Sequence, residues 1–226
     1  MKTPTLKYVP SRSIHYLKCP YFLKLSNIVD IPIDEPHIVG IQKTQLFKNE
    51  VIERLARRKG LTLIKAQRPL DIILNRGLIL ISTKLDTVFY QTEHVSMLIH
   101  MFKPDVVETS QTGEIIKVNV KSIKNTYDLK EHHYLQSFVY KLALEKALVG
   151  ATIKKYKVVP SIIYWKADSS HQLEAGKDIE GFSTMLANIS EHDLFSETDI
   201  SDEQTFCINS LQKIGTLNPQ QDKTKW

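Results

Sequence analysis

Cysteine is scarce in this chain, and long apolar runs are absent. Only two cysteines, Cys19 and Cys207, occur among the 226 residues, so the sequence offers neither a CxxC metal motif nor a disulfide framework. No apolar run approaches the roughly 18 residues of a membrane-spanning helix, and the N-terminal residues lack the apolar centre of a signal peptide. These absences predict an intracellular protein, cytoplasmic or nuclear, without a membrane partner.

The composition is that of a globular domain with a modest excess of positive charge. Of the residues, 42% are hydrophobic and 24% are charged, and the formal net charge is +5. A chain of this length can bury one good apolar core. The charge is compatible with a polyanionic partner such as nucleic acid, but many basic proteins bind none. A basic α/β protein without any nucleic-acid role therefore stays open.

Two β-branched segments separated by turn residues predict a β-hairpin near the middle of the chain. The first covers residues 103–108 and the second residues 113–122, and both contain paired valines or isoleucines. The residues between them, Ser-Gln-Thr-Gly at 110–113, are typical of a turn. We expect the rest of the fold to be organised around this hairpin.

Three polar residues of the hairpin are expected to share one face. A turn centred near Thr112 would place Asp105 opposite Asn119, with their side chains roughly 5 Å apart. Side chains alternate between the two faces along a strand, so Lys121 would lie on the same face as Asn119. The pattern thus predicts that Asp105, Asn119 and Lys121 meet on one side of a sheet.

Helical and strand-like periodicities flank the hairpin. Apolar residues spaced by four predict a helix over residues 43–59, and a period near 3.6 predicts another over residues 129–149. Apolar runs between residues 72 and 102 predict an antiparallel meander that joins the hairpin, and residues 156–165 predict a further strand. Together these segments predict an α/β fold with a mixed central sheet flanked by helices.

The chain is expected to consist of one folded domain and a C-terminal extension. The domain covers residues 1–165, which contain the periodic segments described above. Residues 166–226 are poorer in apolar side chains, with helices expected near residues 179–189 and 202–214 and a disordered tail over residues 218–226.

The hairpin also resembles a known catalytic motif. Pro104-Asp105, followed on the next strand by Asn119-Val120-Lys121, resembles the motif of the PD-(D/E)XK nucleases. Gln136 and Tyr140, which follow Lys121 on the next expected helix, resemble the Gln-x-x-x-Tyr element of the RecB-like branch. This resemblance implies a restriction-endonuclease-like fold.

The resemblance further implies a metal-dependent nuclease that acts on DNA. Asp105 and Glu50 would bind Mg²⁺ or Mn²⁺ through oxygen. Lys121 would activate water or stabilise charge beside the metal, and Asn119 would occupy the second motif position. Gln136 and Tyr140 would position the nucleic acid.

The chain departs from the family pattern at several positions. Asn119 stands where the motif has an acidic residue, and Asn49 stands where the RecB-like branch has a histidine. Cys19-Pro20 resembles an N-terminal element of the CRISPR-associated RecB-like nucleases, in which the cysteine joins three others around an iron–sulfur cluster. Because only Cys207 follows it here, no such cluster is expected.

Alternatives exist for individual residues and for the function. Glu50 is equally well explained by an i,i+4 helix pair with Arg54, and Asp86 is a rival to Asp105 as the first metal ligand. The loss of an acidic residue at position 119 also favours a second function. In that alternative the chain is a nuclease-fold subunit that no longer cuts and instead binds nucleic acid or a protein partner.

Overall fold

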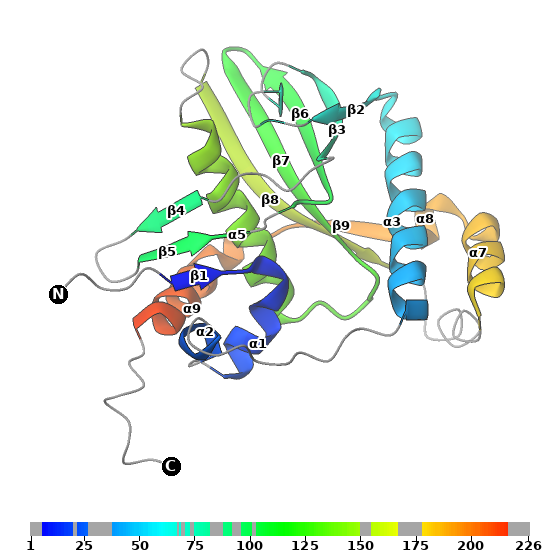
Figure 1. Cartoon of the computed structure of the whole chain (residues 1–226). Helices are drawn as coiled ribbons and strands as arrows, with labels where there is room; N and C mark the ends of the chain where they lie inside the picture. The colour runs from blue at the N-terminus through cyan, green and yellow to red at the C-terminus, as the bar shows by residue number, and fades with distance from the viewer. Residues whose placement is uncertain are drawn as a thin grey trace.

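The structure is a computed structural model, and it describes most of the chain. The described residues are 6–19, 22–26, 38–66, 68, 71–72, 75–81, 88–91, 96–100, 103–149, 155–166 and 178–216. Within them the chain forms a large sheet with helices on both faces and a smaller sheet beside it (Figure 1).

The large sheet has six strands and is mixed. Its strands β2 and β3 run parallel, as do β7 and β8, and the other neighbours are antiparallel. The α/β class expected from the sequence is therefore confirmed, and the arrangement is consistent with a restriction-endonuclease-like fold. In spatial order the strands are β2 (Leu63–Ala66), β3 (Gly77–Ile81), β6 (Val106–Thr112), β7 (Ile115–Lys124), β8 (Lys155–Trp165) and β9 (Phe195–Asp199).

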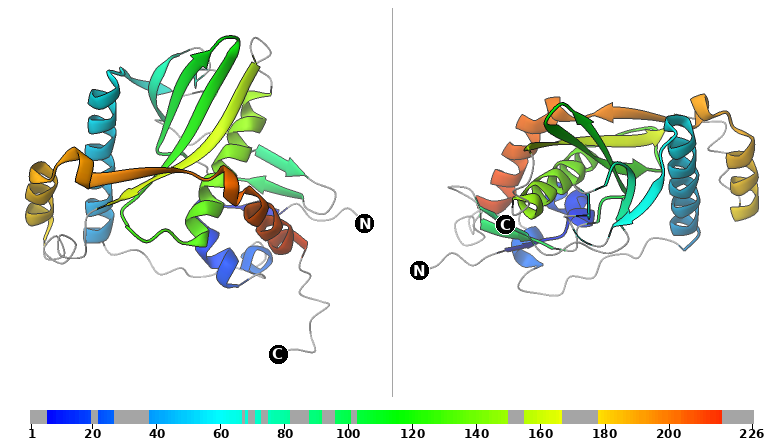
Figure 2. Two further views of the ribbon diagram at one scale, coloured as in Figure 1. Left: turned by 180° about the vertical axis from the view of Figure 1, so that it is seen from behind. Right: turned by 90° about the horizontal axis from the view of Figure 1, so that it is seen from above.

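Helices cover both faces of this sheet (Figures 1 and 2). One face packs against α5 (Glu131–Leu148), with α1 (Ser13–Lys18) and α9 (Gln204–Thr216) beside it. The other face packs against α3 (Ile38–Lys59) and α7 (Ile179–Asn188). None of the described helices is long and apolar enough to span a membrane. The shorter elements are η1 (Pro10–Arg12), α2 (Phe22–Leu25), α8 (Glu191–Leu194) and η2 (Ser201–Glu203).

Alternation along β7 explains why helices are needed on both faces. Val118 and Val120 are buried in the apolar cluster that contains Phe138 of α5. Ile123, on the opposite face, is buried in the cluster that contains Phe47 of α3 and Trp165 of β8. A strand that buries apolar side chains on both faces must be covered on both sides.

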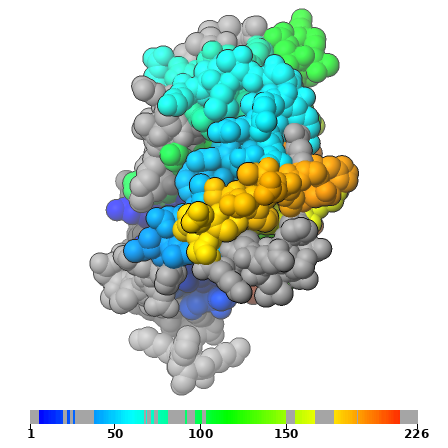
Figure 3. Space-filling model, turned by 90° about the vertical axis from the view of Figure 1, so that its right-hand side faces the viewer, coloured from blue at the N-terminus to red at the C-terminus, as the bar shows by residue number. Residues whose placement is uncertain are grey.

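The cluster under α3 is built around three aromatic rings in contact, of which Phe47 and Trp165 are stacked and Phe182 is tilted against Trp165. The ring centroids of Phe47 and Trp165 lie 5.1 Å apart, and those of Trp165 and Phe182 lie 5.6 Å apart. Figure 3 shows α7 and α8 lying across α3, which closes this side of the molecule. Aromatic pairs at such distances add stability beyond the area that they bury.

The smaller sheet corrects one expectation. Its strands are β1 (Leu6–Tyr8), β5 (Ser96–Ile99) and β4 (Val88–Gln91), in that order. The meander expected over residues 72–102 is therefore wrong, because β3 pairs directly with β6, Ile72 is helical, and β4 and β5 pair apart from the large sheet. Period-two patterning identifies strands but not their partners, and here β5 pairs with β1, which lies near the N-terminus of the chain.

The C-terminal residues belong to the same core as the rest of the chain. Strand β9 pairs with β8 at the edge of the large sheet (Figure 2), and Leu211 and Ile214 of α9 are buried in the cluster under α5. The expected helices are present as α7 and α9. The division into a domain over residues 1–165 and a helical extension is therefore corrected, while residues 217–226 lie outside the described part.

The register of the β6–β7 hairpin differs from the expected one. The turn lies later in the chain, where Gly113 has a φ of 57° that favours glycine. As a result Glu108, not Asp105, lies opposite Asn119, and Val106 lies opposite Lys121. Each β6 residue is paired with a β7 residue three positions later than expected. Because side chains alternate between the two faces, a shift by an odd number of positions places Asp105 and Lys121 on opposite faces of the sheet.

Lys121 instead belongs to a buried ion-pair network on the α3 side of the sheet. Its side chain is 1% exposed, and its Nζ lies 2.8 Å from Glu108 Oε2 and also bonds Glu197 Oε1. Glu108 accepts a second bond from Lys59, at 2.6 Å, and Glu197 accepts one from Ser161, at 3.1 Å. Lys121 and these four residues link α3, β6, β7, β8 and β9 through two carboxylates that share the Lys121 ammonium group.

This network predicts a large loss of stability when Lys121 is removed. Lys121→Ala should lower the free energy of unfolding by about 3 kcal/mol, because it removes a fully buried side chain and leaves the partly buried Glu108 and the more exposed Glu197 without their shared cation. Lys117→Ala, an exposed position on the same strand, should change it by less than about 0.5 kcal/mol. Urea unfolding of both variants measures the difference, and equal stabilities would contradict the structural role.

Candidate functional site

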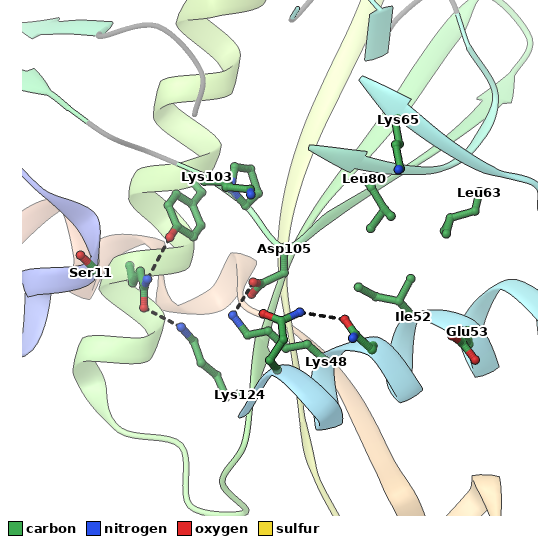
Figure 4. A pocket seen from close by; sticks show the side chains of 15 residues that line it. Ser11, Lys48, Ile52, Glu53, Leu63, Lys65, Leu80, Lys103, Asp105 and Lys124 are labelled. Atoms are coloured by element: carbon green, nitrogen blue, oxygen red, sulfur yellow. Dashed lines mark hydrogen bonds and ion pairs between the residues drawn. The ribbon is translucent and has the colours of Figure 1, made fainter. Parts of the chain in front are cut away.

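A pocket of about 680 Å³ opens beside the start of β6 and the end of β7. Figure 4 shows Asp105 near its middle, with Lys48 and Lys124 close by and Glu53 at the far end. Its walls come from segments that are far apart in the sequence, which is typical of functional pockets. The described lining residues are Ser11, Gln45, Lys48, Asn49, Ile52, Glu53, Leu63, Lys65, Leu80, Lys103, Pro104, Asp105, Lys124, Gln136 and Tyr140.

Both carboxylate oxygens of Asp105 are bonded. Oδ1 accepts a charged hydrogen bond from Lys48 Nζ of α3 at 2.5 Å, and Oδ2 accepts the backbone N–H of Ile123 at 2.7 Å. Asp105 lies at the bend just before β6, and continuing the hairpin register by one residue places it beside Ser122. The aspartate is thus held between α3 and β7, with an ammonium group on one side.

A chain of hydrogen bonds runs from β7 to α5 in the same pocket. Lys124 Nζ donates to Gln136 Oε1 at 2.5 Å, and Gln136 Nε2 donates to Tyr140 Oη at 2.9 Å. Gln136 and Tyr140 are four residues apart and therefore share a face of α5. The amine of Lys124, the amide of Gln136 and the phenol of Tyr140 therefore all line the pocket around Asp105.

The charge state of Lys124 is sensitive to this environment. Burial lowers the pKa of Lys124 to about 8, an effect that Asp105 opposes and that Lys48 strengthens. Burial also raises the pKa of Tyr140, so the phenol stays protonated. The described lining of the pocket carries four lysines, of which Lys48 and Lys124 lie nearest Asp105, against the two carboxylates of Asp105 and Glu53.

The structure brings together only some of the residues expected at the site. Asp105, Gln136 and Tyr140 line one pocket, as the sequence led us to expect. Lys121 and Asn119 do not, because Lys121 is buried in its ion pairs with Glu108 and Glu197, and Asn119, on the same face of β7, lies opposite Glu108. The expected cluster of Asp105, Asn119 and Lys121 on one face is therefore wrong. Asp86 lies outside the described residues.

Glu50 is also placed elsewhere, in a packing role. Its Oε1 accepts a bond from Arg54 Nε at 2.5 Å, which is the i,i+4 pair considered as the alternative. The guanidinium of Arg54, itself buried, donates to the carbonyl oxygens of Leu186 and Ile189 at 2.6 and 2.7 Å. Glu50 thus orients an arginine that satisfies the C-terminal end of α7, and it does not line the pocket around Asp105.

Sequence reasoning missed Lys48 and Lys124 of this pocket, and the buried Ser122 next to it. Relative to Asp105, Ser122 and Lys124 occupy the positions that had been assigned to Asn119 and Lys121. The position of the turn-forming glycine was the signal that could have found them. No sequence pattern pointed to Lys48, because its contact with Asp105 joins residues 57 positions apart.

The described residues around Asp105 do not fit a divalent metal. Mg²⁺ and Mn²⁺ favour several oxygen ligands, carboxylates above all. Here both oxygens of Asp105 are bonded, Lys48 places an ammonium group on the carboxylate, and Ser122 is hydrogen-bonded to Ser137 at 2.8 Å. No cluster of three His, Cys, Asp or Glu side chains suited to a metal occurs among the described residues. The donor set fits an anion better, and Mg²⁺ or Mn²⁺ binding stays a prediction.

This arrangement predicts that a metal site can be made by two changes. Lys48→Ala removes the ammonium group, and Ser122→Asp supplies a second anionic oxygen next to Asp105. Together they should raise the affinity for Mn²⁺, measured by titration calorimetry, on the order of tenfold or more over the wild type.

The matched control combines Lys48→Ala with Asn119→Asp, which adds the same carboxylate to the other face of the same strand. Circular dichroism checks that each variant is folded, since Ser122 is fully buried. Equal Mn²⁺ affinities of the two double variants would show that Lys48 and Ser122 do not determine metal binding. Tight binding of Mn²⁺ by the wild type would show that the residues around Asp105 do fit a divalent metal.

Comparison with other proteins adds no identification. No protein-family model, no curated protein and no solved structure matches this chain. The function must therefore be argued from the geometry of the pocket around Asp105.

Proposed function

We propose that this chain binds nucleic acid through the phosphate backbone and does not cut it. The observation that carries the proposal is the Lys48–Asp105 pair beside Lys124, which leaves the pocket with net positive charge at the place where a nuclease would bind metal. Phosphate contacts from lysine supply most of the affinity in non-specific nucleic-acid binding.

The lining of the pocket supports a phosphate ligand over an apolar one. Lys65 and Lys103 line it along with Lys48 and Lys124, so four lysines converge on one concavity. Concave cationic sites attract polyanions more strongly than flat ones do. The amide of Gln136 adds a neutral donor that can contact phosphate or sugar oxygens.

The resemblance to PD-(D/E)XK nucleases supports the same proposal once the observed register is used. Asp105, then Ser122-Ile123-Lys124, then Gln136 and Tyr140 follow the order of the RecB-like motif. Serine stands at the acidic position and is engaged by Ser137. A nuclease-like pocket that keeps its lysine and polar residues but lacks one carboxylate is suited to holding a phosphodiester without hydrolysing it.

A metal-dependent DNA nuclease is the second candidate, because Asp105 and Lys124 share one pocket with the Gln-x-x-x-Tyr pair. Labelled single- and double-stranded DNA incubated with Mn²⁺ or Mg²⁺, beside an EDTA control, separates the two. Our proposal expects no metal-dependent cleavage. Cleavage that is lost in Lys124→Met would establish the nuclease instead.

Salt dependence tests the proposed binding mode. The affinity for a fluorescently labelled oligonucleotide should fall with added salt by roughly 0.9 log units per log unit of salt for each phosphate contact on duplex DNA. Lys124→Met should weaken binding and lower this slope by about one contact. Fluorescence anisotropy measures both quantities.

The control for that experiment is Lys117→Met, which removes an exposed lysine from the other end of the same strand. Equal losses in the two variants would mean that general charge, and not the pocket, holds the nucleic acid. Binding that does not respond to salt would favour the alternative of a protein partner.

The pKa of Lys124 predicts a dependence of binding on pH. Phosphate favours the ammonium form, and burial lowers the pKa of Lys124 to about 8, so the Lys124 contribution is present below pH 8 and is lost as the pH rises toward 9. In Lys124→Arg the side chain stays charged throughout, and the decline should be smaller. Identical pH profiles of the two proteins, measured by anisotropy, would show that Lys124 does not contact the nucleic acid.

A further inference from the structure

A second, smaller pocket lies next to the N-terminal turn η1. Its volume is about 230 Å³, and its described lining residues are Lys7, Val9, Arg12, Tyr16, Ser26 and His100. Arg12 of η1 lines this pocket, and Ser11, the preceding residue, lines the larger pocket around Asp105. The two pockets therefore lie on either side of the same short turn.

Apart from Val9, the described side chains that line the second pocket are basic or carry hydroxyl groups. Lys7 comes from β1, Arg12 from η1 and His100 from the residue that follows β5. None of the described lining residues is acidic. Basic groups that converge from three separate elements onto a small concavity favour an anionic ligand.

Tyr16 gives this pocket a fixed polar group. Its side chain is 1% exposed, and its ring packs against Tyr8 and Phe22 with centroids 4.6 and 5.7 Å away. Its hydroxyl oxygen accepts the backbone N–H of Val9 at 3.2 Å. A phenol can donate as well as accept, so this rigidly held hydroxyl can still give its proton to a ligand oxygen.

We propose that this second pocket binds a phosphate group, and that the phosphate belongs to nucleic acid held in the pocket around Asp105. The second part rests on the proposed function. Phosphate offers several acceptor oxygens and negative charge, which match the guanidinium of Arg12 and the hydroxyl of Tyr16. The nucleic-acid strand then crosses η1, with phosphates in both pockets.

Two variants test the pocket itself, with inorganic phosphate as the probe. Phosphate should shift the amide NMR signals of residues 7–12 in a saturable way. Arg12→Gln and Tyr16→Phe should each raise the apparent dissociation constant roughly three- to tenfold, since each removes one hydrogen bond to the anion. Tyr16→Phe keeps the buried ring and removes only the hydroxyl.

The matched control is Tyr8→Phe. Tyr8 is also buried, and its hydroxyl is bonded to Ser13 Oγ at 2.8 Å, but it does not line the pocket. Phosphate affinity in this variant should equal that of the wild type. Phosphate binding that is absent in the wild type, or equal in all four proteins, would overturn the proposal.

A labelled oligonucleotide tests the source of the phosphate. Arg12→Gln should weaken oligonucleotide binding and lower its salt slope by about one contact, and inorganic phosphate should compete. If Arg12→Gln lowers phosphate affinity but leaves oligonucleotide affinity unchanged, the phosphate bound in the second pocket does not belong to nucleic acid. The proposed function is then still tested separately by Lys124→Met. If phosphate binds but no oligonucleotide binds to any variant, the proposed function fails and the source is overturned with it.

Discussion

The turn at Gly113 determines which side chains of β7 meet Asp105. A two-residue turn with glycine in the left-handed region fixes the pairing of β6 with β7. Because the two faces of a strand alternate, this register sends Lys124 into the pocket with Asp105 and sends Lys121 to the opposite face. The distribution of charge across the sheet depends on this one backbone constraint.

The two lysines illustrate how environment divides roles along a single strand. Lys121 is matched by Glu108 and Glu197, so its charge is neutralised inside the protein and contributes to the packing of the sheet. Asp105 is already paired with Lys48, and Lys124 donates to the neutral amide of Gln136. The surplus charge is therefore on the pocket side, where an anionic ligand can neutralise it.

Sequence patterns predicted the elements of the fold well and the site only in part. Apolar periodicity identified α3, α5, β8 and the hairpin, since each is encoded locally. The Gln136–Tyr140 pair was found because i,i+4 spacing is also local. The register was missed because a shift in the turn reverses every face, and Lys48 was missed because its contact with Asp105 depends on how a distant helix packs. The partners of β4 and β5 were missed for the same reason.

The backbone amide of Ile123 provides the most direct test of whether the pocket is built for an anion. Its N–H is bonded to Asp105 Oδ2, so its NMR signal reports any ligand that reaches that carboxylate. If the pocket binds an anion, an oligonucleotide shifts this signal, whereas an equimolar amount of Mn²⁺ leaves its width unchanged. Strong paramagnetic broadening by Mn²⁺, with no response to the oligonucleotide, would contradict anion binding.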